Sequence, residues 1–125
     1  MRIDVHSHLV YLPYLEYLTG RNSLPDGVLR DGTYFVSCTG GYLHASPIMH
    51  ADVDQKLRDM DDLGIGMSIL SHGMPGPELL GGQLADDWAT RINDHLAEVI
   101  QSYPGKFQPL GDIGLGQRRT DDYGD

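Results

Sequence analysis

The chain has little of what several classes of protein require. Its 125 residues include one cysteine, Cys38, so no disulfide can form within the chain. This fits a reducing compartment, with the cytoplasm as the default location, and it also fits a protein that simply needs no disulfide. Lys and Arg number nine against eighteen Asp and Glu, which gives a formal net charge of −9. Because a phosphate backbone is bound by clustered basic side chains, no nucleic-acid partner is expected.

Long hydrophobic runs are also missing. No window approaches the roughly 20 apolar residues of a membrane span, so no membrane partner is expected. Asp4, His6 and His8 interrupt the opening segment, where a secretory signal would need an uninterrupted apolar run. The composition, 40% hydrophobic and 22% charged, is ordinary for a soluble protein with one domain core.

Apolar periodicity predicts two long helices. Val53, Leu57 and Met60 recur at the i, i+4 and i+7 spacing of a helix, which Asp52 can cap and Gly64 can end. A second helix is predicted from an apolar stripe that stops near a Tyr-Pro-Gly sequence. The stripe consists of Leu84, Trp88, Ile92, Leu96, Val99 and Ile100.

Three strands are predicted around these helices. Residues 2–8 form a short first strand, with Ile3, Val5 and Ser7 on one face. The nearly continuous apolar run 65–70 is typical of a parallel strand covered on both faces, and residues 107–113 form the third strand. The order of strand, insert, helix, strand, helix and strand predicts an α/β fold whose crossovers build a parallel sheet.

The segment after the first strand is less regular. A short helix is predicted over residues 12–19, after Pro13, and residues 21–27 have the composition of a loop. Residues 33–37 and 42–44 flank a Thr-Gly-Gly sequence, which predicts a small β-hairpin.

These elements define one domain. We assign residues 1–116 to it, with an insert at about residues 20–50 that contains the hairpin. Residues 117–125 lose all hydrophobic patterning, so a disordered tail is predicted there.

His6 and His8 stand two residues apart at the end of the first predicted strand. Side chains at that spacing leave one face of a strand with their backbones about 6.6 Å apart, so both imidazoles can converge on one ion at a Zn–N distance of about 2.0 Å. A lone His-x-His also occurs by chance as a solvated pair. The position at the carboxyl end of an apolar first strand, where barrel active sites are built, favours a catalytic metal.

Other candidate residues carry weaker signals. Asp4 shares the face of the two histidines and could orient a ligand, or could be a hydrogen-bonded carboxylate at a barrel floor. His72 ends the second predicted strand and could line a pocket, although a histidine in a Gly- and Pro-rich loop is more often solvated. His44 and His50 lie in the insert, where exposure is the simpler interpretation. Cys38 has no evident activating partner, so a nucleophilic role is not expected.

Residues 3–8, Ile-Asp-Val-His-Ser-His, resemble the opening motif of the amidohydrolase superfamily. Within that superfamily they look like the branch of 2-amino-3-carboxymuconate-6-semialdehyde decarboxylase and related carboxy-lyases. The likeness extends to residues 58–65 with the strand that follows, and to residues 93–107 with the Pro-Leu-Gly that comes shortly after. Together these segments span about nine tenths of the chain in the family's order.

The resemblance implies the N-terminal part of a TIM-type (β/α)8 barrel that holds one divalent metal, usually Zn2+, with His6 and His8 as two ligands. The family's other ligands and its acid–base histidine belong to later strands. A complete barrel needs roughly 250 residues, so the chain would cover well under half of it. Members of the decarboxylase branch place a substrate-carboxylate arginine before the first long helix, whereas residues 33–51 contain no arginine.

Two hypotheses about function follow. The first is that the chain is the N-terminal part of a metal-dependent carboxy-lyase or hydrolase that acts on a small carboxylated, aromatic-derived substrate. The second is a truncated, non-catalytic domain that binds a partner or self-associates as a homo-oligomer, because the edges of a three-stranded parallel sheet would be open to pairing.

Overall fold

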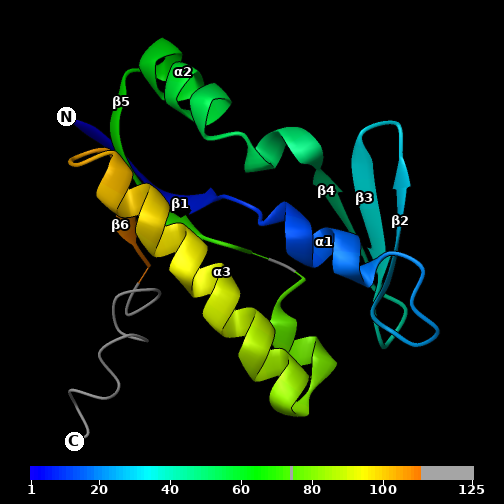
Figure 1. Cartoon of the computed structure of the whole chain (residues 1–125). Helices are drawn as coiled ribbons and strands as arrows, with labels where there is room; N and C mark the ends of the chain where they lie inside the picture. Colours follow the sequence, from blue (N-terminus) through cyan, green and yellow to red (C-terminus); the bar gives the residue numbers. More distant parts are fainter. Residues whose placement is uncertain (74, 111–125) are drawn as a thin grey trace, which may run out of the picture.

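The computed structural model describes residues 1–73 and 75–110, which form two separate sheets joined by helices (Figure 1). The elements in chain order are β1 (Arg2–His8), α1 (Leu12–Leu18), β2 (Asp26–Arg30), β3 (Thr33–Ser37), β4 (Leu43–Pro47), the 3-10 helix η1 (Ile48–Ala51), α2 (Val53–Leu63), β5 (Ile65–Ser71), the 3-10 helix η2 (Pro77–Leu80), α3 (Gly82–Ser102) and β6 (Phe107–Pro109). The predicted tail at 117–125 lies outside the described residues, as do positions 111–113 of the third predicted strand.

The larger architectural unit is a parallel sheet with strand order β1-β5-β6. The connection from β1 to β5 contains α1, the insert and η1 and ends with helix α2, which packs against β5. Helix α3 connects β5 to β6 and packs against β6. This arrangement confirms the predicted α/β fold with three parallel strands and two crossover helices. Strands β1 and β6 form the two edges of this sheet.

The boundaries of α2 follow from its capping residues. The Asp52 side chain accepts a hydrogen bond from the backbone N–H of Gln55 at 3.1 Å, which satisfies one of the free donors at the helix start. Gly64 ends the helix in the left-handed conformation, with φ 71° and ψ 26°. Both predicted ends of this helix are confirmed.

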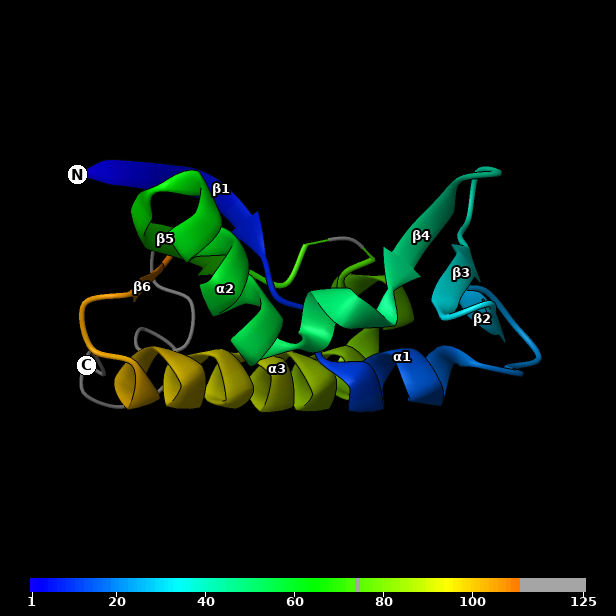
Figure 2. The ribbon, with the colours of Figure 1, turned by 90° about the horizontal axis from the view of Figure 1, so that it is seen from above.

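Helix α3 supplies much of the core and lies alongside α1 (Figure 2). Trp88, Ile92 and Leu96 are buried as the predicted stripe requires, whereas Leu84 is 36% exposed. Tyr14 of α1 contacts Trp88, with ring centroids 5.6 Å apart. The buried cluster comprises Leu9, Val10, Tyr14, Leu15, Leu18, Tyr34, Val36, Cys38, Met60, Leu70, Trp88, Ile92, Leu96, Val99 and Phe107.

The insert is larger than the predicted hairpin. It is a three-stranded antiparallel sheet with the order β2-β3-β4, because residues 26–30 form a strand where the composition of residues 21–27 indicates a loop. Asp31 and Gly32, with φ of 51° and 76°, make the two-residue turn between β2 and β3. In Figure 2 this small sheet and the parallel sheet lie at opposite ends of the molecule.

The parallel sheet is covered incompletely by the described residues. Ser68 and Leu70 of β5 are buried, whereas Ile65, Met67 and Ile69 are only partly buried, so the prediction that both faces of this strand are covered holds for one face. No helix of the described segments is both long enough and apolar enough to cross a membrane.

Candidate metal centre at the end of strand β1

The two histidines of β1 lie side by side at the carboxyl end of the strand. The Nε2 atoms of His6 and His8 are 3.1 Å apart, and the ring planes meet at 76°. The backbone N–H of Leu9, the next residue, donates to the Ser71 carbonyl at 2.9 Å, which places the pair beside the end of β5. The structure therefore brings together the two imidazoles that the sequence singles out.

The separation of the two Nε2 atoms fits a shared metal ion. Two nitrogens at about 2.05 Å from a tetrahedral zinc ion are roughly 3.3 Å apart, close to the 3.1 Å observed between His6 and His8. The same distance also fits a hydrogen bond between two neutral imidazoles. Within residues 1–73 and 75–110, no group of three or more His, Cys, Asp and Glu side chains could hold a metal ion, so the described residues offer at most these two imidazoles to such an ion.

An irregularity in β1 includes His6, the first histidine of this pair. Asp4 pairs with Ser68 and Ser7 pairs with Leu70, so three steps along β1 match two steps along β5. One extra residue in β1 is the feature of a β-bulge, which re-aims side chains. Pairing along β1 is therefore irregular between Asp4 and Ser7, while His6 and His8 lie side by side as the predicted alternation requires.

The apolar face predicted for β1 is only partly buried. Ser7 is buried, but Ile3 and Val5, which the sequence pattern places on the same face, are 45% and 67% exposed. Strand β1 is an edge of its sheet, and this part of it is open to solvent.

Asp4 acts on the backbone within this bulge. Its Oδ1 accepts a hydrogen bond from the backbone N–H of His6 at 3.1 Å. Among the hydrogen bonds of the described residues, none joins the Asp4 carboxylate to an imidazole ring. Asp4 therefore lies close to the two histidines, but its carboxylate binds the backbone of β1 and not an imidazole ring.

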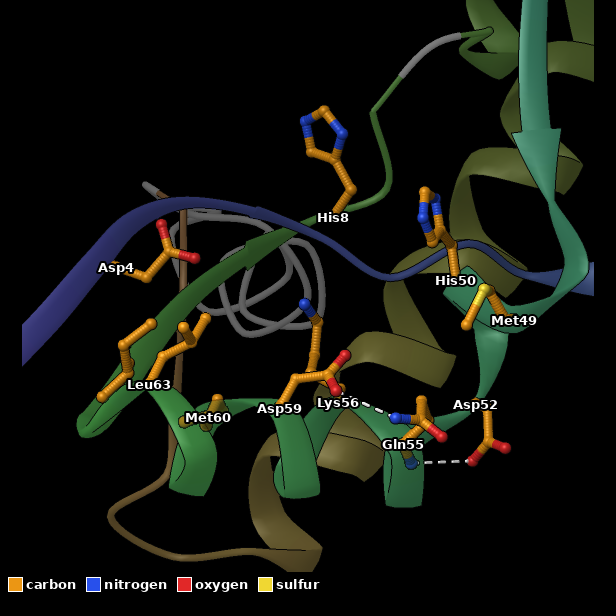
Figure 3. Close-up of a pocket in the computed structure, with 11 residues that line it drawn as sticks. Asp4, His8, Met49, His50, Asp52, Gln55, Lys56, Asp59, Met60 and Leu63 are labelled. Atoms are coloured by element: carbon orange, nitrogen blue, oxygen red, sulfur yellow. Dashed lines mark hydrogen bonds between the residues drawn. The ribbon is translucent and has the colours of Figure 1, made fainter.

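A cavity of about 240 Å³ opens beside His8, between β1, η1 and α2 (Figure 3). Burial, followed by the neighbouring His6, lowers the pKa of His8, which favours the neutral imidazole that a metal requires. Burial also lowers the pKa of Lys56, while Asp4 and Asp59 oppose that effect. The lining residues are Asp4, His8, Met49, His50, Asp52, Gln55, Lys56, Asp59, Met60, Leu63 and Ile65.

Two residues of this cavity carry little signal in the sequence. His50 belongs to the insert, where exposure is expected, and the structure places it, still exposed, on the wall of the cavity. Lys56 looks like an ordinary polar residue of an amphipathic helix, yet its Nζ donates to the buried Ser7 Oγ. The only sequence signal for either residue is its closeness to the start of α2.

His72 is buried rather than solvated, with 6% of its surface exposed. Its Nδ1 donates to the Gly73 carbonyl at 3.3 Å, and its Nε2 has no partner among the described atoms. It lines a second cavity of about 260 Å³ against α3, together with Asn93 and Glu78. The prediction of a pocket position agrees with this placement, and the interpretation as a solvated loop residue is wrong.

The burial of His72 predicts a pH dependence of stability. Burial lowers the pKa of His72 from 6.5 to about 4, so the unfolded chain takes up this proton first as the pH falls. Stability is therefore expected to fall between about pH 6.5 and pH 4, by roughly 3 kcal/mol. Urea unfolding at both pH values measures this, and His72→Gln should flatten the dependence. If the stability of His72→Gln falls with pH as much as that of the wild type, titratable groups other than His72 cause the pH dependence.

The remaining candidates agree with their simpler interpretations. Cys38 is buried, and burial raises the pKa of its thiol, which opposes a nucleophilic role. The sequence places His95 off the apolar stripe of its helix, most simply as a surface or flank residue, and it lies partly buried on α3 with its ring centroid 4.8 Å from that of Tyr11. Trp88 belongs to the core, as predicted.

Comparison with known proteins gives matches among solved structures. No family model matches the sequence, and no curated protein matches it. The apo form of IDCase from Metarhizium anisopliae superposes with a TM-score of 0.71 at 19% identity, over 89% of this chain and 34% of that one. The 5-carboxyvanillate decarboxylase from Sphingomonas paucimobilis gives 0.64 at 21% identity, over 88% of this chain and 33% of that one.

A third match is a protein from Staphylococcus aureus assigned to the amidohydrolases, with a TM-score of 0.60 at 18% identity over 98% of this chain and 34% of that one. The chain thus spans about one third of the length of each structure. At these identities the likeness concerns the fold. The chain therefore has the fold of the N-terminal part of a TIM-type barrel and matches about one third of each of these structures.

Proposed function

We propose that this chain is the N-terminal part of a metal-dependent carboxy-lyase or hydrolase that acts on a small carboxylated substrate. The observation that carries the proposal is the pair of Nε2 atoms of His6 and His8, 3.1 Å apart at the carboxyl end of the first strand of a parallel sheet. Active sites of TIM-type barrels are built at that end of the strands. The decarboxylase among the matching structures supports the class of reaction.

In this proposal His6 and His8 are neutral ligands of one divalent ion, with Zn2+ as the expected metal because two imidazoles suit it. Such an ion, when bound, lowers the pKa of a water molecule and polarises a substrate oxygen. The chain itself holds the two rings side by side, lowers the pKa of His8 by partial burial, and contributes the cavity beside them. The remaining ligands and the acid–base group are expected outside residues 1–125.

The proposed class of substrate comes from one of the matching structures. One matching structure decarboxylates 5-carboxyvanillate by its name, which is an aromatic carboxylate. We propose an aromatic-derived carboxylate for this chain by analogy of fold. The identity of the substrate is open to a screen for CO2 release from aromatic and ring-cleaved carboxylic acids.

Removing either histidine is expected to abolish metal retention in a longer protein that includes this chain. Each variant leaves one imidazole from β1, and losing a ligand of a catalytic site costs most of the metal affinity. Zinc per protein after dialysis measures the effect in His6→Ala and His8→Ala. His44→Ala is the matched control, because His44 lies in β4 of the insert. Metal-free wild-type protein, with full activity in His6→Ala, would refute the proposal.

A second function is favoured by a different observation. Ile3 and Val5 on edge strand β1 are 45% and 67% exposed. An exposed apolar edge strand promotes pairing with another chain, so a non-catalytic domain that self-associates is the alternative. Size-exclusion chromatography separates the two. A cooperatively folding monomer at all concentrations counts against self-association, and a dimer that Val5→Lys dissociates supports it.

A further inference from the structure

A side-chain contact between two distant segments lies beneath the histidine pair. Nζ of Lys56, in the second turn of α2, donates a hydrogen bond to Oγ of Ser7 in β1. Ser7 is 5% exposed and stands between His6 and His8 in the sequence. A buried hydroxyl that accepts a bond from a cation is fixed more firmly than one bonded to a neutral group.

This contact falls on the bulge of β1. Three steps of β1, from Asp4 to Ser7, face two steps of β5. The ladder is interrupted there, so the backbone depends on other contacts for its conformation. Two are present: the Asp4 carboxylate accepts from the His6 N–H at one end, and Lys56 reaches Ser7 at the other.

The bulge matters because of the distance between the rings. Residues two apart on a strand have backbones about 6.6 Å apart, which lets both imidazoles reach one ion, so a change in the backbone between them would change the distance between their rings. In β1 the Nε2 atoms of His6 and His8 lie 3.1 Å apart. His6 lies within the irregular stretch, and His8, which pairs with Ser71, directly follows it.

We propose that Lys56 is a positioning residue for the metal pair, which acts through the Ser7 hydroxyl to hold the β1 bulge in the form that brings His6 and His8 together. This proposal rests on the proposed function, because it takes the two histidines as metal ligands. It assigns Lys56 no contact with metal or substrate.

Another role for Lys56 makes a different prediction. Lys56 lines the cavity beside His8, so a free ammonium could attract an anionic ligand there. Asp4, Asp52 and Asp59 line the same cavity, which makes its charge unfavourable for an anion. A free cation would not depend on Ser7, whereas a positioning residue would.

The test is a double-mutant cycle with Zn2+ alone as the probe, measured by competition with a chromophoric chelator. Lys56→Met and Ser7→Ala are each expected to weaken Zn2+ binding about tenfold, as losses of supporting contacts around metal ligands do. The double variant should also bind Zn2+ about tenfold more weakly than the wild type, because the two substitutions remove the same contact. Lys56→Arg should restore much of the affinity. Arg58→Met, which removes an exposed cation from the same helix, is the matched control.

A second readout needs no metal. Hydrogen exchange of the His6 amide, which donates to Asp4, reports the bulge directly. Both single variants should speed this exchange relative to amides of β5, while urea unfolding shows whether the whole chain has lost stability.

The outcomes separate the two proposals. If wild-type protein binds Zn2+ and Ser7→Ala binds it equally well, Lys56 does not act through Ser7 and the inference fails while the proposed function stands. If wild-type protein and His6→Ala bind Zn2+ equally weakly, the proposed function fails. If, in addition, the His6 amide exchanges in Lys56→Met as slowly as in the wild type, Lys56 does not hold the β1 bulge and the inference fails as well.

Discussion

Replacing Gly73 with alanine is expected to weaken metal binding at the histidine pair by more than tenfold. Gly73 follows β5 with φ +83°, and a Cβ atom built there would lie 2.8 Å from Nδ1 of His8. The His8 ring therefore packs directly against the bare backbone of Gly73. Any side chain must push the ring, and a metal ligand tolerates little displacement.

A matched control separates this clash from backbone strain. Gly41 has φ +84°, and a Cβ atom added to it would have no neighbouring atom within 4 Å. Gly41→Ala therefore introduces the same backbone strain as Gly73→Ala but no clash with another side chain. Strain of this kind is worth roughly 1–2 kcal/mol in either variant. Zn2+ affinity of both variants, with urea unfolding alongside, measures the difference. Equal affinities in Gly73→Ala and Gly41→Ala would show that the His8 ring does not depend on this packing.

Replacing Trp88 with alanine is expected to destabilise the fold by about 3–5 kcal/mol, a large share of the roughly 5–15 kcal/mol that a domain has. Trp88 is 7% exposed and joins α3 to α1. Its ring lies 5.6 Å from that of Tyr14 and 5.2 Å from that of Tyr17, and the Arg91 guanidinium lies 4.1 Å over its centroid. Loss of the indole leaves a cavity and removes the cation–π contact.

The measurement follows helix content by circular dichroism, because Trp88 is the sole tryptophan and its fluorescence is lost with it. Leu84→Ala is the control on the same helix. Leu84 belongs to the predicted apolar stripe but is 36% exposed, so its truncation should have a much smaller effect. A loss in Trp88→Ala no greater than in Leu84→Ala would contradict the assigned role of Trp88 in joining α1 to α3.

Strand β2 of the insert could not be predicted from the local sequence pattern. Residues 21–27 have the composition of a loop, yet Asp26 and Gly27 begin β2. Their strand conformation comes from pairing with β3, in which Gly27 lies opposite Val36. A Cβ atom at Gly27 would lie 3.5 Å from Val36 and 3.7 Å from Leu18, which are ordinary packing distances. Turn propensity is a local property, and the cross-strand contacts override it.

The sequence by itself determined the parallel order of the strands, both ends of α2, the core role of Trp88 and the position of His6 and His8 at the end of the first strand. These features depend on residues close together in the chain: a cap, a helical repeat or a two-residue spacing. They could therefore be predicted without a structure.

The tertiary structure alone decided how the pair is held. The bulge of β1 appears only in its pairing with β5, Lys56 reaches Ser7 across 49 positions, and Gly73 meets the His8 ring from the end of another strand. His72 is buried because α3 and Tyr14 pack over it. Each of these contacts joins segments that the chain brings together only on folding, and no local periodicity encodes which side chains will then meet.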